Sequence, residues 1–317
     1  MCRLFGFKAS RSTNIRFSLA HAPNAIRAQS ASSADGWGIG FYAAHVARVI
    51  KRPISAEEDT TFIRLSDKIR SDTVVAHLRK GTVGGVNTLN CHPFQYHNWM
   101  LAHNGTLEKA TEIRALILQD LSPKLQENVR GATDSELCFH IFLDILQREF
   151  HADLDDPKLS SNLIFQALRS AIHCMDRLGE RAGATLVSRL NFMLTNGQVM
   201  LAARRGHALF TLERSNRSDI ASMYGPLMGS SGLNMSLDVM LQEEEAADTP
   251  RRSVLIASEP ISTESWQMVQ QDSVVIVEAD CEWRAQPLDS LNAAGRDRLE
   301  MFIWKRMYDN MQRDNNA

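Results

Sequence analysis

Cys2 is the residue of this chain whose type and position best suit nucleophilic chemistry. Removal of the initiator Met would leave a thiol and a free α-amine on the same residue. The thiolate is the reactive form of cysteine, and an α-amine with an ordinary pKa of about 7.7 to 8 can accept the thiol proton. The first six residues therefore predict an active site at the N-terminus, although for Cys2 alone a small buried side chain in a first strand is the alternative.

Three further segments carry residue types that suit the cleavage of an amide bond. Arg79 follows an expected buried strand, where a guanidinium can clamp a carboxylate through two parallel hydrogen bonds and the next glycines let the loop approach a ligand. Asn104 and Gly105 can supply a side-chain amide and a backbone N–H, which are the two donors of an oxyanion hole. The segments are residues 77–84 (HLRKGTVG), 103–107 (HNGTL) and 132–136 (ATDSE).

Each of these residues also has an ordinary structural explanation. Asp134 stands at the expected start of a helix, where spacing alone favours an N-cap, with Thr133 as the neighbouring candidate. Arg79 can form a salt bridge, and Asn-Gly is a common turn dipeptide. Their joint presence with Cys2 is what favours a catalytic site.

The composition favours one large domain whose partners are small molecules or proteins. The 317 residues are 44% hydrophobic and carry a formal net charge of -2, which gives no reason to expect a nucleic acid or an anionic membrane surface as partner. The five cysteines include no CxxC pair, and no stretch approaches the roughly 18 apolar residues of a membrane span, so we expect a reducing, cytoplasmic location. No metal or other cofactor is expected, because the candidate ligands lack the recurring spacing of a metal site: His77, Cys91, His92, His97 and His103.

The hydrophobic periodicity predicts strands, then a block of helices, then more strands. This order favours an α+β fold in which segregated helices cover the sheets. Asn196-Gly197 separates two strand-like runs by two residues and predicts a tight antiparallel hairpin turn. Apolar residues at helical spacing predict helices over residues 107–121 and 135–150, and a third helix that carries Ile164, Leu168, Ile172 and Met175. The expected strands are residues 37–42, 73–78, 98–102, 185–195, 198–203, 208–212, 253–257 and 273–277.

Two segments differ from this core. Residues 215–252 are polar and contain an acidic run, so we interpret them as a long surface excursion. Residues 286–317 predict a C-terminal amphipathic helix and a polar tail, which would pack on the domain or on a partner. The main domain is therefore expected over residues 2–285.

Together, these motifs resemble those of the class II glutamine amidotransferases. The resemblance implies the fold of the N-terminal nucleophile hydrolases, a four-layer αββα sandwich with two antiparallel sheets. It implies that Cys2 begins the mature protein as the catalytic nucleophile and that Asn104 and Gly105 form the oxyanion hole. It also implies that Arg79 binds the α-carboxylate of the substrate and that Asp134 binds its α-ammonium.

Within this family, the chain resembles the stand-alone members, which include γ-glutamyl hydrolases of glutathione breakdown and of ergothioneine synthesis. Members fused to a sugar-phosphate isomerase domain have Trp and His where this chain has Lys80 and Val83, which leaves the preferred γ-glutamyl donor open. Thr82 would add a hydroxyl near the substrate carboxylate, and residues 35–38 would line the pocket. The motifs of this branch are residues 33–40 (SADGWGIG), 90–94 (NCHPF) and 258–260 (SEP).

The function implied by the resemblance is hydrolysis of the γ-amide of glutamine through a γ-glutamyl thioester on Cys2. One alternative is a hydrolase of γ-glutamyl peptides or conjugates, which shares the first half-reaction. Another is a non-catalytic, glutamine-binding subunit of a partner enzyme. An acceptor synthase or a peptidase subunit would be the protein partner, and the sequence leaves open whether the chain is a monomer or a homo-oligomer.

Overall fold

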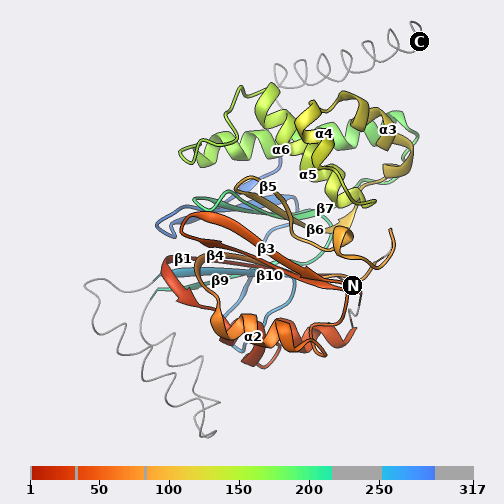
Figure 1. Cartoon of the computed structure of the whole chain (residues 1–317). Helices are drawn as coiled ribbons and strands as arrows, with labels where there is room; N and C mark the ends of the chain where they lie inside the picture. Colours follow the sequence, from red (N-terminus) through yellow and green to blue (C-terminus); the bar gives the residue numbers. More distant parts are fainter. Residues whose placement is uncertain (1, 33–34, 82–83, 216–251, 290–317) are drawn as a thin grey trace, which may run out of the picture.

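The computed structural model describes residues 2–32, 35–81, 84–215 and 252–289, and these residues form four layers (Figure 1). Two antiparallel sheets lie face to face, and helices cover the outer face of each sheet. The predicted α+β class and the αββα sandwich are thereby confirmed. Thr82, most of the predicted excursion over 215–252 and most of the predicted C-terminal helix lie outside the described residues.

The first sheet has seven strands in the order β11-β9-β10-β1-β4-β2-β3. Each pairing between neighbours in this sheet is antiparallel. The central strand β1 leads directly from Cys2, so the fold places the N-terminus at one end of a buried strand. The strands are β1 (Arg3–Asn14), β2 (Trp37–Ala43), β3 (Val46–Arg52), β4 (Arg70–Leu78), β9 (Phe210–Arg214), β10 (Ser253–Ala257) and β11 (Gln267–Met268).

The second sheet has six strands in the order β13-β12-β8-β7-β6-β5, also antiparallel throughout. Its strand β6 carries the predicted oxyanion residues, and its partner β7 belongs to a segment almost ninety residues later in the chain. The strands are β5 (Phe94–Tyr96), β6 (Trp99–Thr106), β7 (Arg189–Thr195), β8 (Met200–Arg204), β12 (Ser273–Val277) and β13 (Trp283–Pro287).

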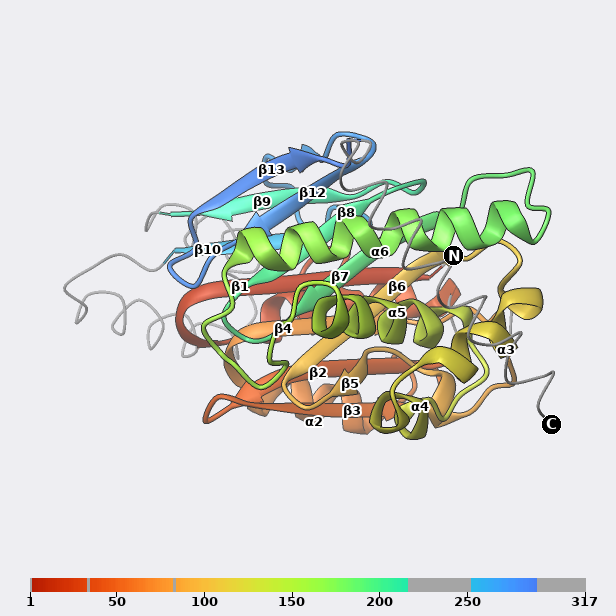
Figure 2. The ribbon, with the colours of Figure 1, turned by 90° about the horizontal axis from the view of Figure 1, so that it is seen from above.

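The helices divide between the two outer layers. In the view of Figure 2, α5 and α6 lie over the strands of the six-stranded sheet, while α2 packs on the other sheet. The helices are α1 (Ile26–Gln29), α2 (Thr60–Lys68), α3 (Ala110–Asp120), α4 (Pro123–Asn128), α5 (Asp134–Arg148) and α6 (Ser161–Arg181). No helix of the described residues combines the length and the apolar character needed to cross a lipid bilayer.

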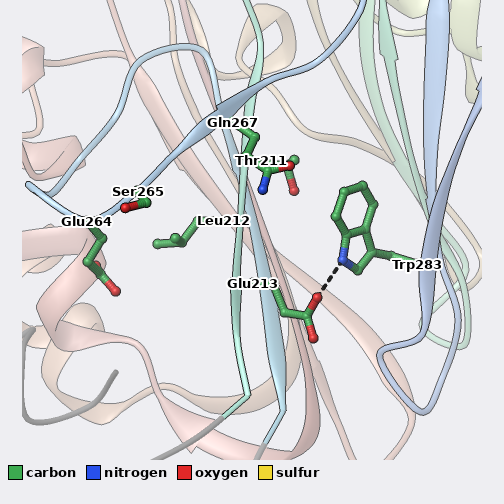
Figure 3. Close-up of a pocket in the computed structure, with 7 residues that line it drawn as sticks. All are labelled: Thr211, Leu212, Glu213, Glu264, Ser265, Gln267 and Trp283. Atoms are coloured by element: carbon green, nitrogen blue, oxygen red, sulfur yellow. Dashed lines mark hydrogen bonds between the residues drawn. The ribbon is translucent and has the colours of Figure 1, made fainter. Parts of the chain in front are cut away.

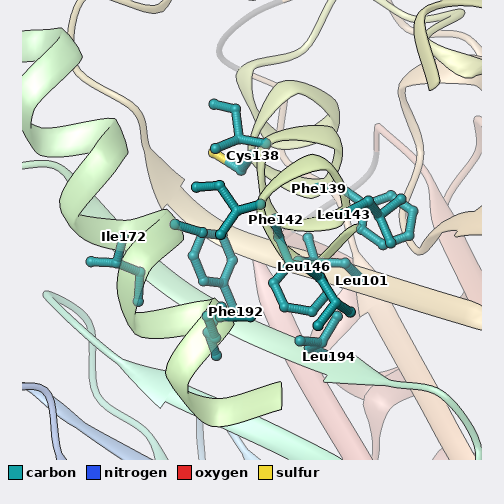
Figure 4. Packing of buried hydrophobic residues seen from close by; sticks show 14 of the residues in the cluster. Leu101, Cys138, Phe139, Phe142, Leu143, Leu146, Ile172, Phe192 and Leu194 are labelled. Carbon is teal, nitrogen blue, oxygen red and sulfur yellow. The ribbon is translucent and has the colours of Figure 1, made fainter. Parts of the chain in front are cut away.

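The largest core cluster lies between the six-stranded sheet and the helices that cover it. Phe142 of α5 projects toward Phe192 of β7, and Ile172 of α6 closes the side of this cluster (Figure 4). All three side chains are buried. Burial of one such side chain stabilises the fold by about 1.5–3 kcal/mol, so this packing holds β6 and β7 in a fixed position under α5.

The two sheets approach each other closely where β1 crosses the second sheet. A Cβ atom added at Gly6 would lie 2.4 Å from the sulfur of Met193, so a larger residue here would have to displace that side chain. Leu4 and Val75 are buried in the same layer between the sheets. The strand that begins beside Cys2 is thus pressed against the sheet that carries Asn104.

Several strand boundaries differ from the sequence-based prediction. The segment predicted over 185–195 forms a strand only from Arg189, and the one predicted over 98–102 continues to Thr106 because it pairs with β7. The β7–β8 hairpin is antiparallel as predicted, but its ladder closes at Thr195 and Met200, so four residues turn instead of two. The reason is that Asn196 Oδ1 accepts hydrogen bonds from the N–H groups of residues 198 and 199 (3.1 and 3.0 Å), which widens the loop.

Candidate active site

Cys2 lies where the ends of β1 and β4 meet. Residues Arg3 and Leu78 are opposite each other in the β1–β4 ladder, which brings the chain after Leu78 alongside Cys2. The backbone N–H of Lys80 donates a hydrogen bond to Cys2 Sγ at 3.2 Å. Burial raises the pKa of the Cys2 thiol above its ordinary value of 9.0, although the Lys80 N–H and the Arg79 charge act in the opposite direction. Burial in this place therefore favours the neutral form of the thiol.

Asn104 approaches Cys2 from the opposite sheet. Its Nδ2 donates to the carbonyl oxygen of Cys2 at 3.2 Å, and its side chain is buried. Because Asn104 belongs to β6, the sheet-to-sheet packing brings its amide to Cys2 across 102 positions of sequence. Asn104 and Gly105 lie inside the strand, whereas the sequence had suggested a turn after it. A Cβ at Gly105 would lie 1.8 Å from the carbonyl oxygen of Arg189, so no larger residue fits there.

His103 holds this strand end in place and is not free to act on a substrate. Its Nε2 lies 3.0 Å from the carbonyl oxygen of Arg189, which can only accept, so this nitrogen carries the proton. Its Nδ1 then accepts from the hydroxyl of Ser135 at 2.9 Å. Burial lowers the pKa of His103, which keeps the ring neutral in this role.

Arg79 is buried at the end of β4 and is enclosed by the loop that follows it. Its Nη2 donates to the carbonyl oxygen of Gly84 at 3.2 Å, and a Cβ at Gly81 would lie 2.7 Å from Nη1. Asp35 Oδ2 accepts from the Gly81 N–H at 2.8 Å and fastens the loop from the other side. The glycines therefore allow the backbone to lie against the guanidinium of Arg79 itself, whereas the sequence had suggested that they let the loop approach a ligand.

Asp134 does not cap α5, so the capping role that spacing favoured for it is wrong. Thr133 is the N-cap, and its Oγ1 accepts from the backbone N–H of Glu136 at 3.3 Å. Asp134 is the first helical residue, and its Oδ2 accepts from the N–H of Leu107 at 2.8 Å. This bond ties the start of α5 to the chain just beyond Gly105, which brings the predicted ammonium ligand beside the predicted oxyanion strand.

A second group of buried polar residues near this site was not assigned any role from sequence. Asn90 and Glu136 are both buried, and each bonds to the backbone of a loop next to Arg79 or Asp134. Their signal in the sequence was weak, because a single Asn or Glu in a loop or a first helical turn has many ordinary explanations. Asn90 did stand in a motif that resembled the stand-alone branch.

His77 and His92 form a buried pair between the sheets. Their Nδ1 atoms are 3.2 Å apart, so one ring donates a hydrogen bond to the other. Burial lowers the pKa of His77 to about 3, and burial and neighbouring charges lower the pKa of His92 well below its usual range. Among the described residues, no group of three or more His, Cys, Asp or Glu side chains is placed to hold a metal ion.

A separate pocket of about 310 Å³ lies beside strand β9 and the edge strand β11 (Figure 3). Its carboxylates already have partners: Trp283 Nε1 donates to Glu213 at 2.8 Å, and the guanidinium of Arg214 makes two bonds of 2.8 and 2.7 Å to Glu264. None of the predicted site residues lines it. We therefore place the candidate active site at Cys2 and not in this pocket.

Comparison with known proteins identifies the family of this chain. Residues 1–290 match the family described as class-II glutamine amidotransferases. The chain is 26% identical to the probable glutamine amidotransferase DUG3 of Saccharomyces cerevisiae, over 87% of this chain and 82% of that protein. It is 25% identical to the γ-glutamyl-hercynylcysteine sulfoxide hydrolase of Mycobacterium tuberculosis, over 70% of this chain and 84% of that protein.

Solved structures show the same fold. A glutamine aminotransferase class-II domain protein from Silicibacter pomeroyi superposes with a TM-score of 0.58 at 16% identity, over 90% of this chain and 98% of that one. The glutamine phosphoribosylpyrophosphate amidotransferase of B. subtilis superposes with a TM-score of 0.56 at 15% identity, over 92% of this chain and 50% of that one. With the family match over residues 1–290, these findings establish that the chain belongs to the class II glutamine amidotransferases.

Proposed function

We propose that this protein hydrolyses the γ-amide bond of a γ-glutamyl substrate, with glutamine as the leading donor, through a thioester on Cys2. The observation that carries the proposal is that Cys2 accepts two hydrogen bonds from distant segments. The Lys80 N–H donates to Cys2 Sγ at 3.2 Å, and Asn104 Nδ2 donates to the Cys2 carbonyl oxygen at 3.2 Å. These contacts support a site in which the Cys2 thiol and the Asn104 amide act together, at the end of the strand that leads to Arg79.

The first half-reaction uses the α-amine that removal of Met1 would free. The amine takes the proton of the Cys2 thiol, and the sulfur attacks the γ-carbonyl carbon, so that an S–C bond forms and the carbonyl oxygen becomes negative. Asn104 Nδ2 and the Gly105 N–H stabilise this oxyanion. The C–N bond then breaks, and the leaving nitrogen takes the proton from the α-amine and departs as ammonia or as an amine.

The second half-reaction releases glutamate. Water gives a proton to the α-amine and attacks the thioester carbon, and the oxyanion that forms occupies the same site as before. When the S–C bond breaks, the sulfur regains its proton. Throughout, Arg79 binds the α-carboxylate and Asp134 binds the α-ammonium, so the γ-carbon stays in one place relative to the sulfur.

A γ-glutamyl peptide or conjugate is the second candidate substrate. The relative from Mycobacterium tuberculosis, which is named a hydrolase of a γ-glutamyl compound, aligns over most of its own length and favours this candidate. The two candidates share every residue assigned above and differ in the group that leaves. A non-catalytic, glutamine-binding subunit is the remaining alternative from another functional class.

One experiment separates these candidates. Glutamate release is measured with glutamine and with a γ-glutamyl peptide such as glutathione, and intact mass spectrometry establishes whether Met1 has been removed. We expect Cys2→Ala to abolish release, while Cys174→Ala, which changes a buried cysteine of α6, leaves it intact. Normal turnover in Cys2→Ala would refute the thioester mechanism. Faster turnover of glutamine would favour an ammonia-supplying enzyme with an acceptor synthase as partner.

A further inference from the structure

Asn90 lies between the loop that follows Arg79 and the loop that precedes Asp134. Its side chain is buried, and both ends of its amide are used. Nδ2 donates to the carbonyl oxygen of Gly85 at 2.9 Å, and Oδ1 accepts from the backbone N–H of Ala132 at 2.9 Å. A single amide therefore joins two loops that are more than forty residues apart in the sequence.

On one side, Asn90 shares a loop with the guanidinium of Arg79. Gly84 has φ of +72°, and a Cβ there would lie 2.7 Å from Asn90 Nδ2. The carbonyl oxygen of the same Gly84 accepts from Arg79 Nη2 at 3.2 Å. The amide and the guanidinium thus hold adjacent peptide groups, at Gly85 and Gly84, so displacement of Asn90 displaces the backbone that contacts Arg79.

On the other side, Asn90 and Glu136 together bind the backbone of the loop that leads into α5. Glu136 accepts from the backbone N–H groups of Arg130 and Gly131 at 3.0 and 2.6 Å, and Asn90 accepts from the next N–H, that of Ala132. A Cβ at Gly131 would lie 2.7 Å from Asn90 Oδ1. Three consecutive N–H groups are therefore bound by two buried side chains, two residues before Asp134.

We propose that Asn90 is a positioning residue that sets the distance between Arg79 and Asp134, and so couples recognition of the two α-charges of the γ-glutamyl substrate. The proposal rests on the proposed function, in which these two residues bind the α-carboxylate and the α-ammonium. Asparagine is suited to this place because one loop offers a carbonyl and the other an N–H. An aspartate would keep the acceptor but face the Gly85 carbonyl with a second oxygen.

The test measures binding and not turnover, so that it does not depend on catalysis. Titration calorimetry on Cys2→Ala protein gives Kd for three probes: L-glutamate, glutarate, which lacks the α-ammonium, and 4-aminobutyrate, which lacks the α-carboxylate. In Asn90→Asp, we expect the Kd for glutamate to rise about tenfold, the factor that matches the loss of one buried hydrogen bond. We expect the Kd for glutarate and for 4-aminobutyrate to change less, because each keeps only one α-charge, which can still bind its own residue after the two loops move relative to each other.

The matched control is Asn14→Asp. Asn14 ends β1 at the strand end opposite to Cys2, and its amide also bridges backbone groups: Nδ2 donates to Asp67 O at 2.8 Å and Oδ1 accepts from Arg16 N at 2.8 Å. Equal changes for all three probes in Asn90→Asp, or the same change in Asn14→Asp, would overturn the proposal. So would a Cys2→Ala protein that binds no glutamate.

A second variant covers the case in which Asn90→Asp fails to fold. Gly131→Ala keeps Asn90 but places a methyl group 2.7 Å from its Oδ1, which pushes the loop before Asp134 away from the amide. The same selective loss of glutamate affinity is expected, and unchanged Kd values would overturn the proposal. Failure of wild-type turnover with intact selective binding would instead refute the proposed reaction and leave the role of Asn90 standing.

Discussion

Replacement of Asn104 by alanine tests the proposed oxyanion site most directly. Asn104 is 6% exposed, and its Nδ2 lies 3.2 Å from the Cys2 carbonyl, so the donor is held in a buried position beside Cys2. Loss of one oxyanion donor typically lowers kcat by about 10² to 10³, or about 2.7–4 kcal/mol of transition-state stabilisation. Loss of the ground-state hydrogen bond lowers folding stability by about 0.5–1.5 kcal/mol. The catalytic effect should therefore exceed the effect on stability.

The assay is glutamate release at saturating substrate, together with the unfolding temperature of each variant. We expect Asn104→Ala to lose kcat with KM changed only a few-fold, because the donor acts on charge that develops in the transition state. Asn98→Ala is the matched control, since Asn98 precedes β6 at its other end and its amide also bridges backbone groups of His45 and Ala47. A kcat within about threefold of wild type, or an equal loss in the control, would refute this assignment.

Three further predictions concern the substrate clamp, acid stability and the core. Arg79→Lys should raise KM about tenfold or more, because an ammonium cannot reproduce the bidentate fork of a guanidinium; steady-state kinetics would show an unchanged KM if Arg79 does not bind the substrate. Burial lowers the pKa of His77 to about 3 from its ordinary 6.5, so the unfolded chain binds more protons between these values and stability should fall as pH decreases through this window. Urea unfolding should show a slope of up to about 1.4 kcal/mol per pH unit from this residue, and His77→Gln should flatten it. Phe142→Ala should lower the free energy of unfolding by about 3–5 kcal/mol, and a loss below about 1 kcal/mol would contradict the packing seen in Figure 4.

The long helices were predictable because their information is local. The apolar spacing over residues 135–150 and the helix that carries Ile164 and Met175 correspond to α5 and α6. A first strand was considered only as the alternative setting of Cys2, and β1 was not among the expected strands. Its sequence contains the charged residue Lys8. In the structure Lys8 is buried, and its ammonium donates to Thr73 Oγ1 and to the Gly197 carbonyl, both at 2.9 Å. A charged side chain satisfied by distant groups cannot be recognised as buried from its neighbours in sequence.

The N-cap of α5 also could not be predicted from neighbouring residues alone. Thr133 and Asp134 are adjacent and both can cap a helix, so composition and spacing do not distinguish them. The distinction comes from Leu107, whose N–H donates a hydrogen bond to the Asp134 carboxylate. Thr133 instead caps the helix by accepting from the Glu136 N–H. Leu107 is 27 positions away along the chain.

The sequence by itself determined which chemical groups are present and which local elements carry them: a thiol at position 2, a guanidinium after a strand, an amide before a glycine and a carboxylate at a helix start. Only the tertiary structure decided that these groups meet. Lys80 contacts Cys2 across 78 positions and Asn104 does so across 102, through strand pairing in one sheet and packing between two. The spacing of apolar residues that predicts a helix or strand depends on near neighbours in the sequence. The contacts at Cys2 depend on the pairing and packing of whole strands, which no local pattern encodes.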